Sequence, residues 1–187
     1  GAGLTPRPSC SYLGSPPSAA NGSVSLSVCP RQVAGRFRAG TIRGMSPRVG
    51  PTCVCGLTSD GEAYCWGSSG SGAFGDGTED LSFRALPARV QGGAVFSSIS
   101  AVSYHGAGGY QDLQQGHTCG VTPDGDAYCW GEGAFGRLGD GTEVRRFVPT
   151  KVATNLKFSS ISAGNTHTCA IAEDRTAWCW GSNEYGK

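Results

Sequence analysis

Three related stretches decide how this chain folds: CGLTSDGEAYCWG (55–67), CGVTPDGDAYCWG (119–131) and CAIAEDRTAWCWG (169–181). In each stretch the two cysteines are ten residues apart, and an aspartate lies midway between them. A glycine follows this aspartate in the first two copies, and Asp-Gly between apolar runs is a strong signal for a β-hairpin. The sequence therefore predicts three hairpins, each with one cysteine on either strand.

The symmetry of each cysteine pair about its turn predicts the geometry of the hairpin. A three-residue loop such as Ser59–Gly61 places the glycine in the left-handed position that this turn requires. Cys55 then faces Cys65 across an antiparallel ladder, where opposed Cα atoms are about 4.5–5.5 Å apart and a disulfide can form. Arg175 replaces the glycine in the third copy, so we expect this turn to be strained or to change type.

The hairpins belong to a repeat of about 50 residues, the spacing between the second and third cysteine pairs. The first and second pairs are 64 residues apart, and most of the difference is a 12-residue insertion near 103–114. Each unit also holds two further β-type stretches, around Pro87–Val90 and Phe96–Ser100 in one copy and Pro149–Val152 and Phe158–Ser162 in the next. A four-stranded unit of this length has the size of one β-propeller blade.

The repeat resembles a known family in motifs that extend beyond the cysteines. The clearest are GRLGDGT (136–142) and AGNTHTC (163–169), which recur in the same order relative to the cysteine stretch. Together they resemble the RCC1 repeat, in the cysteine-paired form found in secreted bacterial proteins. The resemblance covers roughly residues 53–187 and implies an all-β fold, a β-propeller built from four-stranded RCC1-like blades.

The number of units predicts that the propeller is incomplete in this chain. About three to four units are present, whereas closed propellers typically have 4–8 blades. Residues 1–52 match poorly, although Met45–Cys53 fits the register of Ile161–Cys169, so we expect a divergent N-terminal region that is a degenerate blade. Residues 53–187 are the RCC1-like repeats, of which the last is cut mid-repeat. We expect either a fragment of a longer protein or a ring completed by another chain, because an open array leaves strand edges unpaired.

The cysteine spacing favours disulfides over zinc, whose sites prefer C-x₂₋₄-C pairs and grouped histidines. The predicted pairs are Cys55–Cys65, Cys119–Cys129, Cys169–Cys179 and Cys10–Cys29. Cys53 takes the first cysteine position by the repeat register, so either Cys53 or Cys55 can pair with Cys65. The total of nine is odd and leaves one thiol free or joined to another chain. Because disulfides need an oxidising compartment, the sequence predicts an extracellular, cell-surface or periplasmic location.

The insertion SYHGAGGYQDLQ (103–114) is the feature that the repeat does not explain. Its glycines suit a loop, and loops on a rigid scaffold often carry binding residues. The candidate contact residues are Tyr104, His105, Tyr110, Gln111 and Asp112. The alternative is a tolerated surface insertion without a role.

Other motifs have structural explanations. We expect His117 and His167, each two residues before a cysteine, to bond to the backbone within their blades. The two Asp-Gly-Thr motifs at 76–78 and 140–142 predict turns in which Asp or Thr bonds its own backbone, because calcium loops need several alternating oxygen ligands. We expect the repeated tryptophans to pack between blades: Trp66, Trp130 and Trp180. No nucleophile–base constellation or phosphate loop is present, so the sequence predicts neither an enzyme nor a cofactor or metal site.

The net charge of +1 gives no electrostatic signal for nucleic acid, and no apolar run approaches the ~20 residues of a membrane span. The sequence therefore predicts a secreted or surface module that binds a protein or a glycan. An alternative is a structural subunit that associates with itself or another chain to complete its propeller. A third function, guanine-nucleotide exchange, is performed by the eukaryotic protein that gave the family its name. The predicted disulfides disfavour this function, because the thiols of nuclear proteins are kept reduced.

Overall fold

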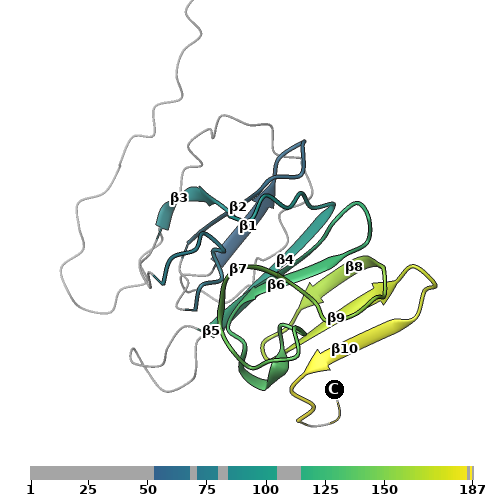
Figure 1. The fold of residues 1–187 in the computed structure, drawn as a ribbon. Coiled ribbons are helices and arrows are strands. Elements are labelled where there is room, and N and C mark those ends of the chain that lie inside the picture. The colour runs from purple at the N-terminus through teal and green to yellow at the C-terminus, as the bar shows by residue number, and fades with distance from the viewer. Residues whose placement is uncertain (1–52, 68–70, 80–83, 105–114, 185, 187) are drawn as a thin grey trace, which may run out of the picture. The chain divides into compact units, whose positions relative to one another are not determined.

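The computed structural model describes residues 53–67, 71–79, 84–104, 115–184 and 186. The N-terminal region 1–52, with the proposed Cys10–Cys29 pair, lies outside the described residues. The described residues form strands and a single short 3₁₀ helix, η1 (Ala134–Gly136) (Figure 1). Within these residues there is no helix that is long and apolar enough to cross a membrane.

The strands form three antiparallel sheets, which we call blades 1, 2 and 3 (Figure 1). Blade 1 contains β1 (Cys53–Leu57), β2 (Ala63–Gly67) and β3 (Arg84–Arg89). Blade 2 contains β4 (Ser98–Tyr104), β5 (Gln115–Val121), β6 (Ala127–Gly131) and β7 (Arg146–Lys151). Blade 3 contains β8 (Phe158–Ala163), β9 (His167–Ala172) and β10 (Ala177–Gly181). The fold is all-β, as the sequence predicts, with one complete four-stranded blade among the described residues.

The blades begin one strand earlier than the order of the sequence motifs suggests. The two FSSIS stretches open blades instead of closing them, since β4 pairs with β5 and β8 pairs with β9. The proline-containing strand β7 closes blade 2 by pairing with β6. In blade 2 the cysteine hairpin therefore occupies the middle of the blade, with an FSSIS strand on one side and a proline strand on the other.

The cysteine hairpins have the predicted register. Cys55 lies directly opposite Cys65 and bonds to it, with the two Cα atoms 4.1 Å apart. The structure contains the equivalent disulfides of blades 2 and 3, Cys119–Cys129 and Cys169–Cys179. Cys53 is the cysteine of β1 outside this pairing; it is buried, and burial raises the pKa of its thiol to about 12.

The turn of the first hairpin is the three-residue loop that the glycine predicts. The Gly61 amide donates to the Thr58 carbonyl, and Gly61 has a φ of +82°. Arg175, at the same place in the third hairpin, keeps this turn with a φ of +71°. The third turn is therefore strained, because a side chain in the left-handed region crowds the following carbonyl.

The hydrophobic core lies between successive blades and forms two clusters. The first joins Cys55, Leu57 and Cys65 of blade 1 to two aromatic residues. Phe96 lies just before blade 2, and Trp130 lies in its strand β6. The second joins the following residues of blade 2 and blade 3: Cys119, Val121, Cys129, Phe158, Ala170 and Trp180. Blade 2 is thus covered on both faces, and its disulfide is fully buried.

Candidate binding surface

A tryptophan fixes each junction between neighbouring blades. Trp130 Nε1 donates to the carbonyl oxygen of Ala73 at 3.0 Å, and Trp180 Nε1 donates to that of Arg137 at 3.0 Å. A threonine hydroxyl donates to the same carbonyl oxygens, Thr118 at 2.9 Å and Thr168 at 2.8 Å. The predicted role of these two tryptophans between blades is confirmed, and two junctions in the described residues share one hydrogen-bonding scheme.

The glycines before the two Asp-Gly-Thr motifs let the loops approach these tryptophans. A methyl group on Gly75 would lie 2.5 Å from Trp130 Nε1, and one on Gly139 would lie 2.6 Å from Trp180 Nε1. Both glycines have a positive φ. In the motif itself, the Thr142 amide and hydroxyl donate to Asp140 Oδ1, which confirms the predicted turn. Burial favours the neutral Asp140 carboxyl, but hydrogen bonds from Arg146 and Thr142 outweigh it and lower its pKa.

His117 is structural, but its partner differs from the predicted backbone group. Its Nε2 lies 2.7 Å from Thr168 Oγ1 of the next blade. Because the Thr168 hydroxyl donates its hydrogen to the Arg137 carbonyl, His117 must donate from Nε2 and is the neutral Nε2–H tautomer. Burial, and then the nearby charges of Arg137 and His167, lower its pKa to about 3. This histidine therefore connects blades 2 and 3.

The candidate insertion begins and ends on paired strands of blade 2. Tyr104, the last residue of β4, lies opposite Gln115, the first residue of β5. The other candidate contact residues lie outside the described residues: His105, Tyr110, Gln111 and Asp112. In blade 3 the corresponding connection between β8 and β9 is only residues 164–166. The insertion is thus held at one end of a complete blade that is covered on both faces.

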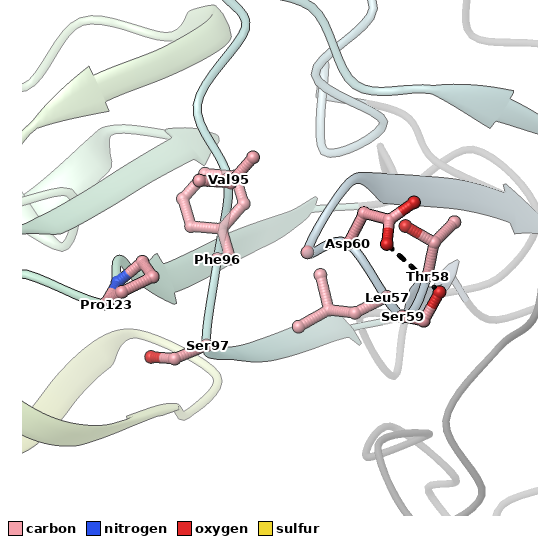
Figure 2. A pocket seen from close by; sticks show the side chains of 9 residues that line it. Leu57, Thr58, Ser59, Asp60, Val95, Phe96, Ser97 and Pro123 are labelled. Atoms are coloured by element: carbon pink, nitrogen blue, oxygen red, sulfur yellow. Dashed lines mark hydrogen bonds between the residues drawn. The ribbon is translucent and has the colours of Figure 1, made fainter.

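A small cavity that sequence analysis missed lies at the other end of β4. It has a volume of about 210 Å³ and lies between the first hairpin turn and the chain that enters blade 2 (Figure 2). Its lining residues are Leu57, Thr58, Ser59, Asp60, Gly61, Val95, Phe96, Ser97 and Pro123. Figure 2 shows Asp60 on one side, Val95, Phe96 and Pro123 on the other, and Leu57 between them. One difference between the repeats could have indicated this cavity: the residue before the FSSIS stretch is Val95 in one copy and the charged Lys157 in the next.

One face of blade 3 is exposed although the same face of blade 2 is buried. Ile171 is 40% exposed, whereas its equivalent Val121 is 1% exposed. Cys179 of the disulfide is exposed as well, while Cys129 is fully buried. This blade 3 face has the apolar composition of a contact between blades and is not covered by the described residues. In the part of the chain that the structure describes, no group of three or more His, Cys, Asp or Glu residues is arranged to hold a metal ion.

Successive antiparallel sheets that stack face to face, joined by tryptophan and threonine bonds to the preceding loop, define a β-propeller. The comparisons identify its type. Two family models described as "Regulator of chromosome condensation (RCC1) repeat" match the chain, one at residues 124–171 and the other at 54–73 and 158–187. The chain belongs to the RCC1-repeat β-propeller family.

The relatives are longer proteins from plants and other eukaryotes. The Ultraviolet-B receptor UVR8 of Arabidopsis thaliana is 35% identical over 111 residues, which are 58% of this chain and 22% of the receptor. The mitochondrial RCC1 domain-containing protein RUG3 of the same plant is 32% identical over 126 residues, 64% of this chain and 25% of that protein. The chain therefore spans about a quarter of the length of these relatives.

Solved structures show the same fold. Yeast RCC1 (Prp20) in its complex with Kap60 is 26% identical, with a TM-score of 0.56, and the match covers 71% of this chain and 31% of that one. Prp20p of Saccharomyces cerevisiae, reported with its binding to Gsp1p and histones, is 25% identical with a TM-score of 0.55. That match covers 70% of this chain and 31% of Prp20p. Human WBSCR16 has a TM-score of 0.56 at 18% identity over 70% of this chain and 31% of that one, a likeness of fold alone.

Proposed function

We propose that the chain is a non-enzymatic, protein-binding β-propeller module, and that its insertion at 103–114 contacts the partner. The observation that carries this proposal is that residues 105–114 of the insertion connect the paired residues Tyr104 and Gln115 of a blade covered on both faces. Such a scaffold presents a variable loop from a fixed base, which is how many binding loops are displayed. The yeast relative supports a protein as the ligand in preference to a glycan, since its solved structures concern Kap60, Gsp1p and histones.

The compartment that we propose is the exterior of the cell, its surface or the periplasm. Three disulfides in the described residues support it, because such bonds persist where thiols are oxidised. The same bonds argue against a nuclear exchange factor. A non-enzymatic role is supported by the engagement of His117 in a contact between blades and of Asp140 in a turn.

The proposal is tested by exchanging the insertion for the short connection of blade 3. A variant in which residues 102–116 are replaced by Gly-Asn-Thr should fold, because residues 164–166 join Ala163 to His167 in blade 3, the counterparts of Ala101 and His117. A photo-reactive amino acid at Tyr110 would first trap the partner in the producing culture, and the same group at exposed Gln91 serves as the control. Binding of the purified partner should be lost in the exchanged variant. Equal binding by both chains would contradict the proposal.

A second candidate function is that of a structural subunit in an extracellular assembly. The exposed apolar face of blade 3 favours it, because Ile171 and Cys179 correspond to buried residues of blade 2. In this alternative a blade of another chain covers that face.

A further inference from the structure

The cavity at the first hairpin turn has a counterpart in the next junction, and the two differ in one informative residue. A methyl group placed on Gly61 would lie 3.3 Å from Val95 Cβ, and one placed on Gly125 would lie 2.9 Å from Lys157 Cβ. Val95 and Lys157 also precede the two FSSIS phenylalanines. They therefore occupy equivalent places beside equivalent turns.

The second junction shows that this place accommodates a cationic side chain. Lys157 Nζ lies 2.7 Å from Asp126 Oδ1. This hydrogen bond, together with attraction from Asp126, Asp124 and Glu173, raises the pKa of Lys157. The methylene stem of the lysine passes beside the turn glycine, and its charge ends among carboxylates.

The first junction keeps two of these carboxylates but not the lysine. Asp60 and Glu62 stand where Asp124 and Asp126 stand in the second hairpin. Glu62 is paired with Arg89, but no cation of the described residues lies within ion-pair distance of the Asp60 carboxylate. Asp60 accepts a hydrogen bond from the neighbouring Ser59 hydroxyl, at 3.3 Å (Figure 2).

The walls of the cavity suit the stem of a long basic side chain. Leu57 and Phe96 are buried beneath it, and Val95 is 44% exposed. Lysine and arginine cover apolar surface with their methylene groups while the charged end stays in a polar environment. Asp60 is exposed at the rim and can turn toward such a group without repacking the core.

We propose that this cavity binds a lysine or arginine side chain of the partner protein, with its stem against Leu57, Val95 and Phe96 and its charge at Asp60. This inference rests on the proposed function, because it takes the basic side chain to belong to the protein that the module binds. It names a second contact, at the opposite end of β4 from the insertion, and the chemistry that this contact recognises. In the next junction Lys157 occupies the equivalent place, where its ion pair is with Asp126, the counterpart of Glu62, and Asp124, the counterpart of Asp60, adds attraction at longer range. Because Glu62 is already paired with Arg89, the proposal places the charge at Asp60.

The probe is the peptide acetyl-Gly-Arg-Gly-amide, and its matched control carries citrulline, which has nearly the same shape without the charge. In amide NMR spectra of the full chain, the arginine peptide should shift the signals of Gly61, Val95 and Ser97 saturably. The citrulline peptide should bind about two- to fivefold more weakly, the effect of one exposed ion pair. Equal shifts with both peptides, or no shifts with either, would overturn the proposal.

Variants separate the cavity from unspecific charge effects. Val95→Lys should fill the cavity with the lysine of the second junction, keep the fold and abolish the response to the arginine peptide. Val144→Lys adds the same charge at an exposed residue outside the cavity and should leave the response intact. Asp60→Asn should weaken binding about two- to fivefold. A Val95→Lys chain that responds like the wild type would refute the site.

These measurements are independent of the test of the proposed function. Cross-linking through Tyr110 reports on the insertion, whereas the peptide shifts report on the other end of blade 2. Loss of the cavity response with intact cross-linking would refute the basic-residue site alone. Loss of cross-linking with an intact peptide response would refute the insertion as the contact with the partner.

Discussion

Arg175 adopts the left-handed conformation that glycine provides in the other two hairpin turns. A side chain in this region destabilises the folded chain by about 1–2 kcal/mol, which a change to glycine would relieve. Glycine offsets part of this relief, because it loses more conformational entropy than other residues when the chain folds. Arg175→Gly should therefore raise the free energy of unfolding by about 0.5–1 kcal/mol. Urea denaturation measures the change.

The reverse substitution is the matched control. Gly125→Arg places a side chain at the same turn position of blade 2, where its Cβ would lie 2.9 Å from Lys157 Cβ. It should lower the free energy of unfolding by more than Arg175→Gly raises it. A neutral or destabilising Arg175→Gly would mean that the arginine side chain makes a stabilising contact that outweighs the strain.

His117 predicts how stability depends on pH. Burial, the largest effect, lowers its pKa in the folded chain to about 3, whereas the unfolded value is about 6.5. As the pH falls from 6.5 toward 3, the unfolded chain takes up a proton that the folded chain excludes. The free energy of unfolding should therefore decrease over this window, by up to about 1.4 kcal/mol per pH unit from this group.

His117→Gln isolates this contribution, because the amide of glutamine can replace Nε2 as the donor to Thr168 but does not titrate. Denaturation at a series of pH values should show a slope that is smaller by about one proton in the variant. Carboxylates such as Asp140 destabilise both chains in acid and cancel from the difference. Identical slopes would show that another group causes the dependence.

At the scale of single residues, local signals were predictable and distant partners were not. The left-handed glycine at 61 and the strain at Arg175 follow from a turn of a few residues. The contact of His117 with Thr168 joins residues that are 51 apart in the chain and depends on how two blades stack. The cavity beside Val95 likewise requires a turn of blade 1 and a turn of blade 2, Pro123, to meet.

At the scale of elements, exposure distinguishes the three disulfides. Cys55–Cys65 and Cys119–Cys129 are fully buried between blades, whereas Cys179 is exposed. A reductant must reach a sulfur atom to attack it, so Cys169–Cys179 should be reduced first. Alkylation under graded reductant, followed by mass spectrometry, measures the order. Simultaneous labelling of all six cysteines would indicate that reduction requires unfolding of the whole stack.

The elements themselves were largely predictable, but their grouping was not. Asp-Gly turns between apolar runs and the cysteine spacing indicate hairpins directly. The assignment of Phe158–Ala163 to the blade that follows it depends on hydrogen bonds to β9, which the order of motifs does not reveal. The repeat length fixes the size of a blade, and the point at which the blade begins is set by strand pairing.

At the scale of the whole molecule, the exposed blade 3 face predicts self-association if the chain is a structural subunit. Contiguous apolar surface of this kind commonly marks an interface. Sedimentation of the native chain should then show a mass above that of the monomer, and Ile171→Lys should reduce it. Val144→Lys, at a residue that is 58% exposed in another part of the surface, should not. A folded monomer at all concentrations would exclude this function.

The tryptophan bonds make the blades interchangeable parts for protein engineering. Trp130 and Trp180 each bond to a main-chain carbonyl, of Ala73 in one junction and of Arg137 in the other. Because every residue carries that carbonyl, the hydrogen bond does not depend on which side chain the acceptor residue has, and alanine and arginine both serve, each buried in its own junction. A copy of blade 2 could thus be spliced between blades 1 and 2 or between blades 2 and 3, where the loop of the preceding blade supplies the acceptor. Arrays of chosen length would then display a chosen loop at a regular spacing.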